Sequence, residues 1–148
     1  MTLLTRRAAL AVGAGATALA MMPSVLLAQD TAEEGLSAEE FINEFTGGAE
    51  VADGDGVKLT APEIAENGNT VPISVDAPGA SEILLLAMGN PTPGVARFSF
   101  GELSGSQSAS TRIRLAETQD VVAIAKLADG NFVRTSANIK VTIGGCGG

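Results

Sequence analysis

Cys146 is the only cysteine of the 148-residue chain, and it stands two residues before the C-terminus. Gly144 and Gly145 precede it, and Gly147 and Gly148 follow it. Because glycine has no side chain and allows nearly any backbone angle, these residues are predicted to form a thin, flexible arm that carries one thiol. Fully extended, such an arm reaches about 16–18 Å. That reach is sufficient to place the thiol inside a narrow cleft of another protein.

The chain supplies this nucleophile without a base to activate it. It contains no His, so a Cys-His dyad and any His-ligated metal or haem site within the chain are excluded. One Cys cannot form a CxxC redox pair, an intrachain disulfide or an iron–sulfur site. Since a cysteine thiol titrates above neutral pH, its activation must come from the cleft that receives the arm. The pattern predicts a carrier with no catalytic residue and no cofactor, rather than an enzyme.

Two acidic patterns are weaker candidates for chemistry. Asp53-Gly54-Asp55-Gly56 resembles the start of a calcium-binding loop, but the remaining ligands and the closing Glu of that motif are missing. A plain turn is therefore the better interpretation of this segment. Glu39, Glu40 and Glu44 lie partly on one helical face and are interpreted as solvated surface. No metal site is predicted.

The other end of the chain predicts where the thiol operates. Arg6 and Arg7 precede an uncharged segment, rich in Ala and Leu, that extends to Ala28. This arrangement is typical of a Tat-type signal peptide, so we expect residues 1–28 to be removed and the protein to be periplasmic. The alternative is an uncleaved membrane anchor, because the segment is nominally long enough to span a bilayer. Its glycines and alanines make it weakly hydrophobic, which favours cleavage and no membrane contact afterwards.

The mature chain of 120 residues has the length of one domain. It keeps seven basic and seventeen acidic residues, for a net charge of −10. That charge disfavours binding to nucleic acid and to anionic membranes, and it suits a partner with a basic face. With five Phe and neither Trp nor Tyr, the core must consist mostly of Val, Ile, Leu and Ala. A domain of this kind is marginal in stability, so an obligate partner would fit.

The elements that must hold the arm are one helix and a series of strands. Ser37 and Glu40 form a capping-box pattern and Gly47-Gly48 a stop signal, which together predict a helix over 38–46. Asn67-Gly68 predicts a turn. Alternating or continuous apolar patterns predict strands near 57–59, 71–75, 83–88, 95–100, 112–115, 121–127, 132–135 and 139–143.

Two further features of the β region are predicted from the residue pattern. The apolar run over 83–88 is consistent with a strand that is buried on both faces. Residues 89–94 and 104–110 are predicted to be loops. The sequence therefore predicts an all-β protein, an antiparallel β-sandwich over 29–143 with a short N-terminal helix, followed by the arm over 144–148.

Several motifs of the chain resemble the SoxY family, the carrier subunit of the sulfur-oxidation (Sox) system. They are the arginine-containing export signal, Asn90-Pro91-Thr92-Pro93, the segment from Arg112 to Gln119, and the terminal segment from Lys140 to Gly148. The terminal Gly-Gly-Cys-Gly-Gly is highly specific, and the other motifs support it. The resemblance implies an immunoglobulin-like β-sandwich in which Cys146 carries sulfur intermediates covalently.

The resemblance also implies the partners and a relay of reactions. A SoxZ-like subunit would form a heterodimer with the chain. A haem c sulfur transferase would join thiosulfate oxidatively to Cys146, a thiosulfohydrolase would release sulfate, and a sulfur dehydrogenase would oxidise the remaining persulfide. Each of these enzymes would admit the same arm, which explains the glycines, since any side chain would have to fit several clefts. The sequence leaves open whether residues 90–94 form an interface loop or only a rigid turn.

Three alternatives to the carrier are also consistent with parts of the sequence. Cys146 can be an incidental thiol, although an exposed odd thiol is vulnerable in an oxidising compartment. It can form a permanent intermolecular disulfide in an exported structural β-sandwich. The terminal Gly147-Gly148 can also act as a ubiquitin-like carboxyl-terminal sulfur carrier, but the ATP-dependent activation of that terminus is cytoplasmic and conflicts with the export signal.

Overall fold

A nine-residue helix, α1 (Ala38–Thr46), opens the part of the chain that the computed structural model describes, which is residues 35–144. Its N-cap Ser37 accepts a hydrogen bond from the backbone N of Glu40, and the Glu40 carboxylate accepts one in return from the Ser37 backbone N at 2.7 Å. Gly47 ends the helix in the left-handed conformation, with φ of 64°. The helix predicted over 38–46 is therefore confirmed, together with both of its caps.

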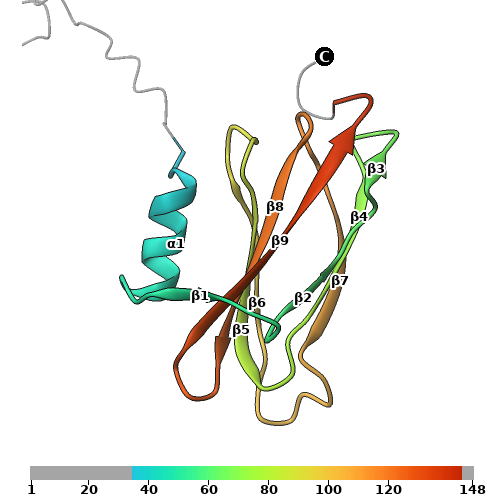
Figure 1. The fold of residues 1–148 in the computed structure, drawn as a ribbon. Helices are drawn as coiled ribbons and strands as arrows, with labels where there is room; N and C mark the ends of the chain where they lie inside the picture. Colours follow the sequence, from blue (N-terminus) through green and yellow to red (C-terminus); the bar gives the residue numbers. More distant parts are fainter. Residues whose placement is uncertain (1–34, 145–148) are drawn as a thin grey trace, which may run out of the picture. The chain divides into compact units, whose positions relative to one another are not determined.

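Within the described residues, nine strands form two sheets (Figure 1). The larger sheet has the order β1-β9-β8-β5-β6, with β3 also paired to β9, and the smaller sheet has the order β2-β4-β7. The strands are β1 Val51–Asp53, β2 Lys58–Thr60, β3 Ile64–Ala65, β4 Val71–Asp76, β5 Ala80–Ala87, β6 Gly94–Ser99, β7 Ser108–Ile113, β8 Gln119–Leu127 and β9 Phe132–Val141. The predicted all-β sandwich with one short N-terminal helix is confirmed.

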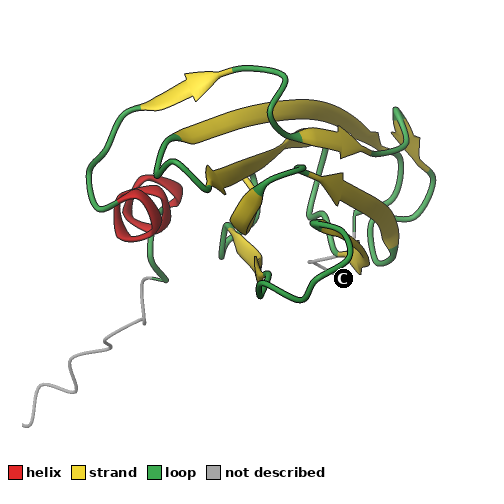
Figure 2. Cartoon of the chain, turned by 90° about the horizontal axis from the view of Figure 1, so that it is seen from below, coloured by secondary structure: helices red, strands yellow, loops and turns green. Residues whose placement is uncertain are grey.

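The central strand β5 is buried on both of its faces, as its continuous apolar sequence predicts. Ile83 and Leu85 point into the core between the two sheets, and both are fully buried. Leu84 and Leu86 point the other way and pack with Phe45 of α1. The helix thus covers the outer face of the larger sheet and does not enter between the sheets (Figure 2).

Three parts of the strand prediction differ from the structure. The loop predicted over 104–110 ends earlier, because β7 begins at Ser108; its serines face solvent and gave no apolar alternation. The segments predicted over 132–135 and 139–143 are one continuous strand, β9, which ends at Val141. The short strands β1 and β3 were not predicted, and both pair with β9 in parallel, in a sandwich whose other pairings are antiparallel.

The capping box makes the stability of α1 depend on pH. The hydrogen bonds from Ser37 hold the pKa of Glu40 below its ordinary value of 4.5. A carboxyl group whose pKa is lowered by folding stabilises the fold above its unfolded-state pKa, and this contribution is lost as the pH falls through the lower folded-state value. We therefore expect amide exchange in α1 to accelerate below about pH 4.5 in the native protein.

The variant that isolates this effect is Glu40→Gln, which keeps the shape of the capping box but cannot titrate. Its α1 exchange, measured by hydrogen–deuterium exchange and corrected for intrinsic rates, is expected to lose the acid dependence. Glu39→Gln in the same turn is the matched control and should behave as the native protein. Equal acid dependence in the native and Glu40→Gln proteins would contradict this assignment.

Candidate functional site

The sequence-predicted site residues fall mostly outside the described part of the chain. Gly144 is the last residue that the structure describes. The predictions that lie outside the described residues concern Arg6, Arg7, Gly145, Cys146, Gly147 and Gly148. The structure therefore defines the base from which the thiol-bearing segment leaves the β-sandwich.

The chain is held by backbone hydrogen bonds until just before Gly144. The Thr142 backbone N donates to the carbonyl of Ala65 at 3.0 Å, which extends the short parallel pairing of β3 with β9. The Gly68 backbone N donates to the carbonyl of Ile143 at 2.7 Å. Although β9 ends at Val141, the backbone is thus fixed through Ile143.

A loop over residues 114–118 contacts the same stretch of backbone from the other side. The Val141 backbone N donates to the hydroxyl oxygen of Thr118 at 2.9 Å. A Cβ atom placed on Gly144 would overlap the carbonyl oxygen of Ala116. At this position glycine is required by the close approach of two backbones, in addition to any need for flexibility.

The side-chain amides of Asn90 and Gln119 hold this loop in place. The Asn90 Oδ1 atom accepts hydrogen bonds from the Ala116 backbone N and from Gln119 Nε2, both at 2.9 Å, and Asn90 Nδ2 donates to the Arg114 carbonyl at 2.8 Å. Gln119 Oε1 accepts from the Gly89 backbone N at 2.7 Å. The Gln119 side chain is buried, with 6% of its surface exposed, and its polar atoms are paired.

The motifs that are separate in the sequence therefore meet at one end of the sandwich. The loop after β5 contains Asn90, the loop before β8 contains Ala116, and β9 leads to Gly144; these segments lie together at the upper end in Figure 1. Asn90 is thus bonded to the loop at the base of the arm. Sequence reasoning did not assign the amide pair of Asn90 and Gln119, although a Gln directly before an apolar strand was the available signal.

The surface around this base carries three exposed apolar side chains. Ile143 is 66% exposed, Ile64 on β3 is 59% exposed, and Met88 at the end of β5 is 41% exposed. A single apolar side chain on a surface is ordinary, but Ile143 directly precedes the arm. This end of the sandwich can therefore offer apolar contact to another protein.

The acidic segment near Asp53 is a turn, as predicted. Asp53 ends β1 and forms an ion pair with Arg134, with Nε and Oδ1 2.7 Å apart, and this pairing lowers the pKa of Asp53. The following residues 54–56 form a bend and turn. Over residues 35–144, no group of three or more acidic, His or Cys side chains is placed to hold a metal ion.

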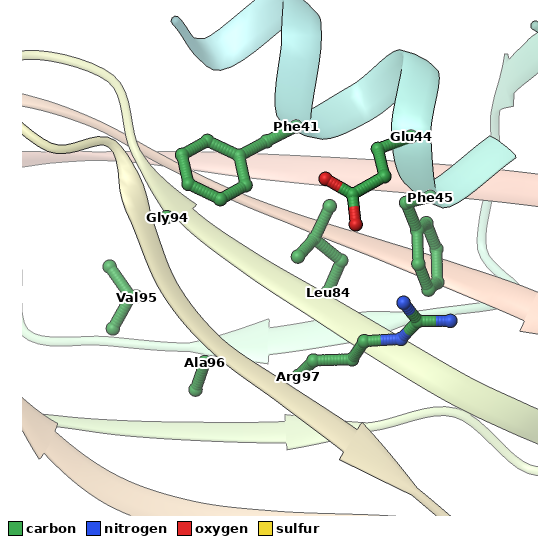
Figure 3. Close-up of a pocket in the computed structure, with 8 residues that line it drawn as sticks. All are labelled: Phe41, Glu44, Phe45, Leu84, Gly94, Val95, Ala96 and Arg97. Carbon is green, nitrogen blue, oxygen red and sulfur yellow. The ribbon is translucent and has the colours of Figure 1, made fainter. Parts of the chain in front are cut away.

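A pocket of about 250 Å³ lies between α1 and β6 (Figure 3). The rings of Phe41 and Phe45 form its helical side, and Gly94 leaves the space that the Phe41 ring occupies. Arg97 lies at its rim, where it is paired with Glu82 and lies 5.1 Å from the centre of the Phe45 ring. These contacts close the helix onto the sheet, and Glu44 and Arg97 are the charged residues that line the pocket.

A membrane-spanning helix is not found among the residues from 35 to 144. The expected signal segment, residues 1–28, lies outside that range.

Comparisons with known proteins agree with the fold. The family model described as "Sulfur oxidation protein SoxY" matches residues 42–146, a range that ends at Cys146. The solved structure of the sulfur carrier protein SoxY from Chlorobium limicola f thiosulfatophilum is 31% identical, with a TM-score of 0.62, and the match covers 71% of this chain and 96% of that one. No curated protein matched the chain.

More distant structures share only the fold. A superoxide reductase (neelaredoxin) from Ignicoccus hospitalis is 18% identical with a TM-score of 0.52, over 76% of this chain and 98% of that one. A putative superoxide reductase from Thermotoga maritima is 17% identical with a TM-score of 0.52, over 62% of this chain and 93% of that one. At such low identity these matches carry no information about chemistry.

Proposed function

Since the chain belongs to the SoxY family of sulfur oxidation proteins and has the role of a sulfur carrier, we propose that it holds thiosulfate-derived sulfur covalently on Cys146. The observation that carries this proposal is the architecture at the base of the arm. The motifs around Asn90, Ala116 and Val141 converge on Gly144, after which the only cysteine of the chain follows within two residues. This arrangement supports a β-sandwich that presents a thiol to other proteins without supplying a catalytic base for it.

The first step of the proposed relay is an oxidation that forms a sulfur–sulfur bond. The Cys146 thiol loses its proton and joins the outer sulfur of thiosulfate, which gives Cys–S–S–SO₃⁻ and releases one electron pair. The haem c group of a sulfur transferase accepts these electrons, because the chain has no redox centre beyond the thiol itself. Cys146 thus supplies one sulfur atom of the new bond, and the enzyme supplies the oxidant.

Hydrolysis then returns the carrier toward its starting state. A thiosulfohydrolase adds water to the terminal sulfone, which leaves as sulfate while a persulfide stays on Cys146. A sulfur dehydrogenase then oxidises the outer sulfur of that persulfide with three water molecules as the oxygen source, which gives Cys–S–SO₃⁻ and passes six electrons to the acceptor of that enzyme. A second hydrolysis releases sulfate and regenerates the thiol. Because Gly145 and Gly147 flank the thiol without side chains, one arm fits the cleft of each enzyme.

We further propose that the mature chain operates in the periplasm as a heterodimer with a SoxZ-like subunit. Arg6 and Arg7 support export by the Tat route, which carries folded proteins and allows the partner to be bound before export. The net charge of −10 after removal of residues 1–28 supports a partner with a basic or neutral face. A partner that binds only the folded chain would raise its apparent stability.

The carrier function is tested by the intact mass of the protein purified without reductant from cells that grow on thiosulfate. We expect adducts of sulfur or thiosulfate on a fraction of the chains, and we expect reductant to remove them. Tandem mass spectrometry should place the adducts on Cys146. Cells grown without reduced sulfur compounds provide the control.

Two outcomes would contradict the proposal. One is a quantitative disulfide dimer on non-reducing electrophoresis, which indicates a permanent structural bridge at Cys146. The other is a mass increase confined to the terminal carboxylate of Gly148, which indicates a ubiquitin-like carrier.

A further inference from the structure

The geometry points to Asn90 and Gln119 as a positioning pair that sets the direction in which the arm leaves the β-sandwich. The inference rests on the proposed carrier function and adds to it, because the two residues act through the loop over 114–118. It assigns them a role in presenting Cys146 to the enzymes that load and unload it. Asn90 and Gln119 together form the amide pair.

Each side-chain amide of the pair has only one orientation that satisfies its neighbours. The backbone N–H groups of Ala116 and Gly89 can only donate hydrogen bonds. Asn90 Oδ1 must therefore face the N–H of Ala116, and Gln119 Oε1 must face the N–H of Gly89. The nitrogen atoms then face acceptors, because Asn90 Nδ2 donates to Arg114 O and Gln119 Nε2 donates to Asn90 Oδ1. A carboxylate at either position would accept hydrogen bonds but could not donate them, so both positions require an amide side chain.

The amide pair acts on the arm through the loop over 114–118. Asn90 holds the backbone N of Ala116, and the carbonyl oxygen of the same residue lies where Gly144 has no room for a Cβ atom. Gly68 links the loop to the chain end, since its carbonyl accepts from the Leu115 backbone N while its own N–H donates to Ile143. The loop is therefore held in place beside Ile143 and Gly144, the last residues of the described chain.

The loop confines Ile143 and Gly144, so the backbone that it holds keeps one direction. If the loop shifts, these two residues are released, and the chain gains freedom of direction from the end of β9 onward. The thiol is then expected to cover a wider range of directions from the β-sandwich. Because an enzyme cleft accepts the thiol only from a limited range of directions, a wider range lowers the productive fraction of encounters.

The test uses the mature chain with a nitroxide label on Cys146 and a second label on a Ser136→Cys substitution, which lies on an exposed position of β9. Double electron–electron resonance then measures the distribution of distances between the two labels. The isosteric variants Asn90→Asp and Gln119→Glu are each expected to broaden this distribution. Gly144→Ala, which changes no buried group and adds only the methyl that meets Ala116, is expected to broaden it as well.

Gln107→Glu is the matched control for the change of charge. Gln107 precedes β7 at the opposite end of the sandwich, and its Oε1 accepts a hydrogen bond from the Gly79 backbone N at 3.3 Å. A Glu at this position can still accept that bond. The control is therefore expected to keep the native distance distribution and the native turnover.

Turnover of the unlabelled variants provides the functional readout. With the enzyme that loads thiosulfate, kcat/KM is expected to fall by up to about a hundredfold in Asn90→Asp and Gln119→Glu, as for a reacting group misplaced by about 1 Å. The rate at which iodoacetamide alkylates Cys146 should stay native, because a small reagent approaches the thiol from any direction. A purely structural role would instead lower the melting temperature and leave both the distance distribution and kcat/KM of the folded fraction unchanged.

The outcomes separate this inference from the proposed function. A native distance distribution in Asn90→Asp, Gln119→Glu and Gly144→Ala would overturn the positioning role, whatever the effect on turnover. The failure of the native protein to gain sulfur on Cys146 would contradict the carrier function. The distance measurement does not depend on sulfur loading, so it tests the positioning role of the amide pair in either case.

Discussion

Replacement of Cys146 by serine is expected to reduce the loading of thiosulfate-derived sulfur to background while the fold stays native. A serine hydroxyl cannot form the sulfur–sulfur bond of the proposed intermediate, and the chain has no second cysteine to replace it. The substitution lies beyond Gly144, the last residue that the structure describes, and outside the core clusters of the described residues. The measurement is the intact mass of the variant after incubation with thiosulfate and the loading enzyme, alongside its melting temperature.

Cys146→Ala serves as the second variant, because it removes the hydrogen-bonding hydroxyl as well as the thiol. Both variants should bind the partner subunit with native affinity, which excludes a loss of assembly as the cause. A serine variant that still gains thiosulfate-derived mass would show that sulfur is held elsewhere. In that case the terminal carboxylate of Gly148 would be the site to examine.

Truncation of either Leu85 or Leu86 to alanine is expected to destabilise the protein by about 2–5 kcal/mol, the usual cost of removing a fully buried leucine side chain. Both side chains are fully buried, but they lie on opposite faces of β5. That cost is a large share of the about 5–15 kcal/mol that stabilises a typical domain. Chemical denaturation measures it directly.

Leu85→Ala and Leu86→Ala should differ in the part of the protein whose amide exchange they accelerate. Leu86 packs with Phe45, so Leu86→Ala is expected to raise amide exchange in α1 above the level that global unfolding explains. Leu85 lies between the sheets, so exchange in α1 of Leu85→Ala should follow global stability. Leu103→Ala is the control, because Leu103 is 100% exposed and should change neither measurement. Equal exchange in α1 of Leu85→Ala and Leu86→Ala at matched stability would contradict this division of the core.

Local sequence signals predicted the elements whose structure depends on neighbouring residues. Ser37 and Glu40 cap α1 with bonds that span three positions, so the helix was readable from the sequence alone. The run over 83–88 predicted a strand buried on both faces, because apolar side chains with no polar alternation need cover on each side. The carrier role also followed from local sequence, since it depends on residue types at the C-terminus.

The strands that were missed depend on partners far away in the sequence. β3 has two residues, and it is a strand only because β9 lies beside it with Ile64 opposite Lys140 and Ala65 opposite Val141. β7 begins among serines whose outward positions carry no apolar pattern, and its register is fixed by β4. Short strands of this kind gain their stability from the pairing itself, which a linear pattern does not contain.

The sequence by itself determined that this protein has one thiol between glycines and neither a His nor a second cysteine to act with it. Only the tertiary structure decided where the arm begins and what holds it. Asn90, Gln119 and Gly144 are distant in sequence, and the hydrogen bonds and the backbone contact that join them through Ala116 exist only after the sheets have packed. Residue types fix the chemistry of a thiol, whereas its direction depends on contacts between separate loops, which form only in the folded chain.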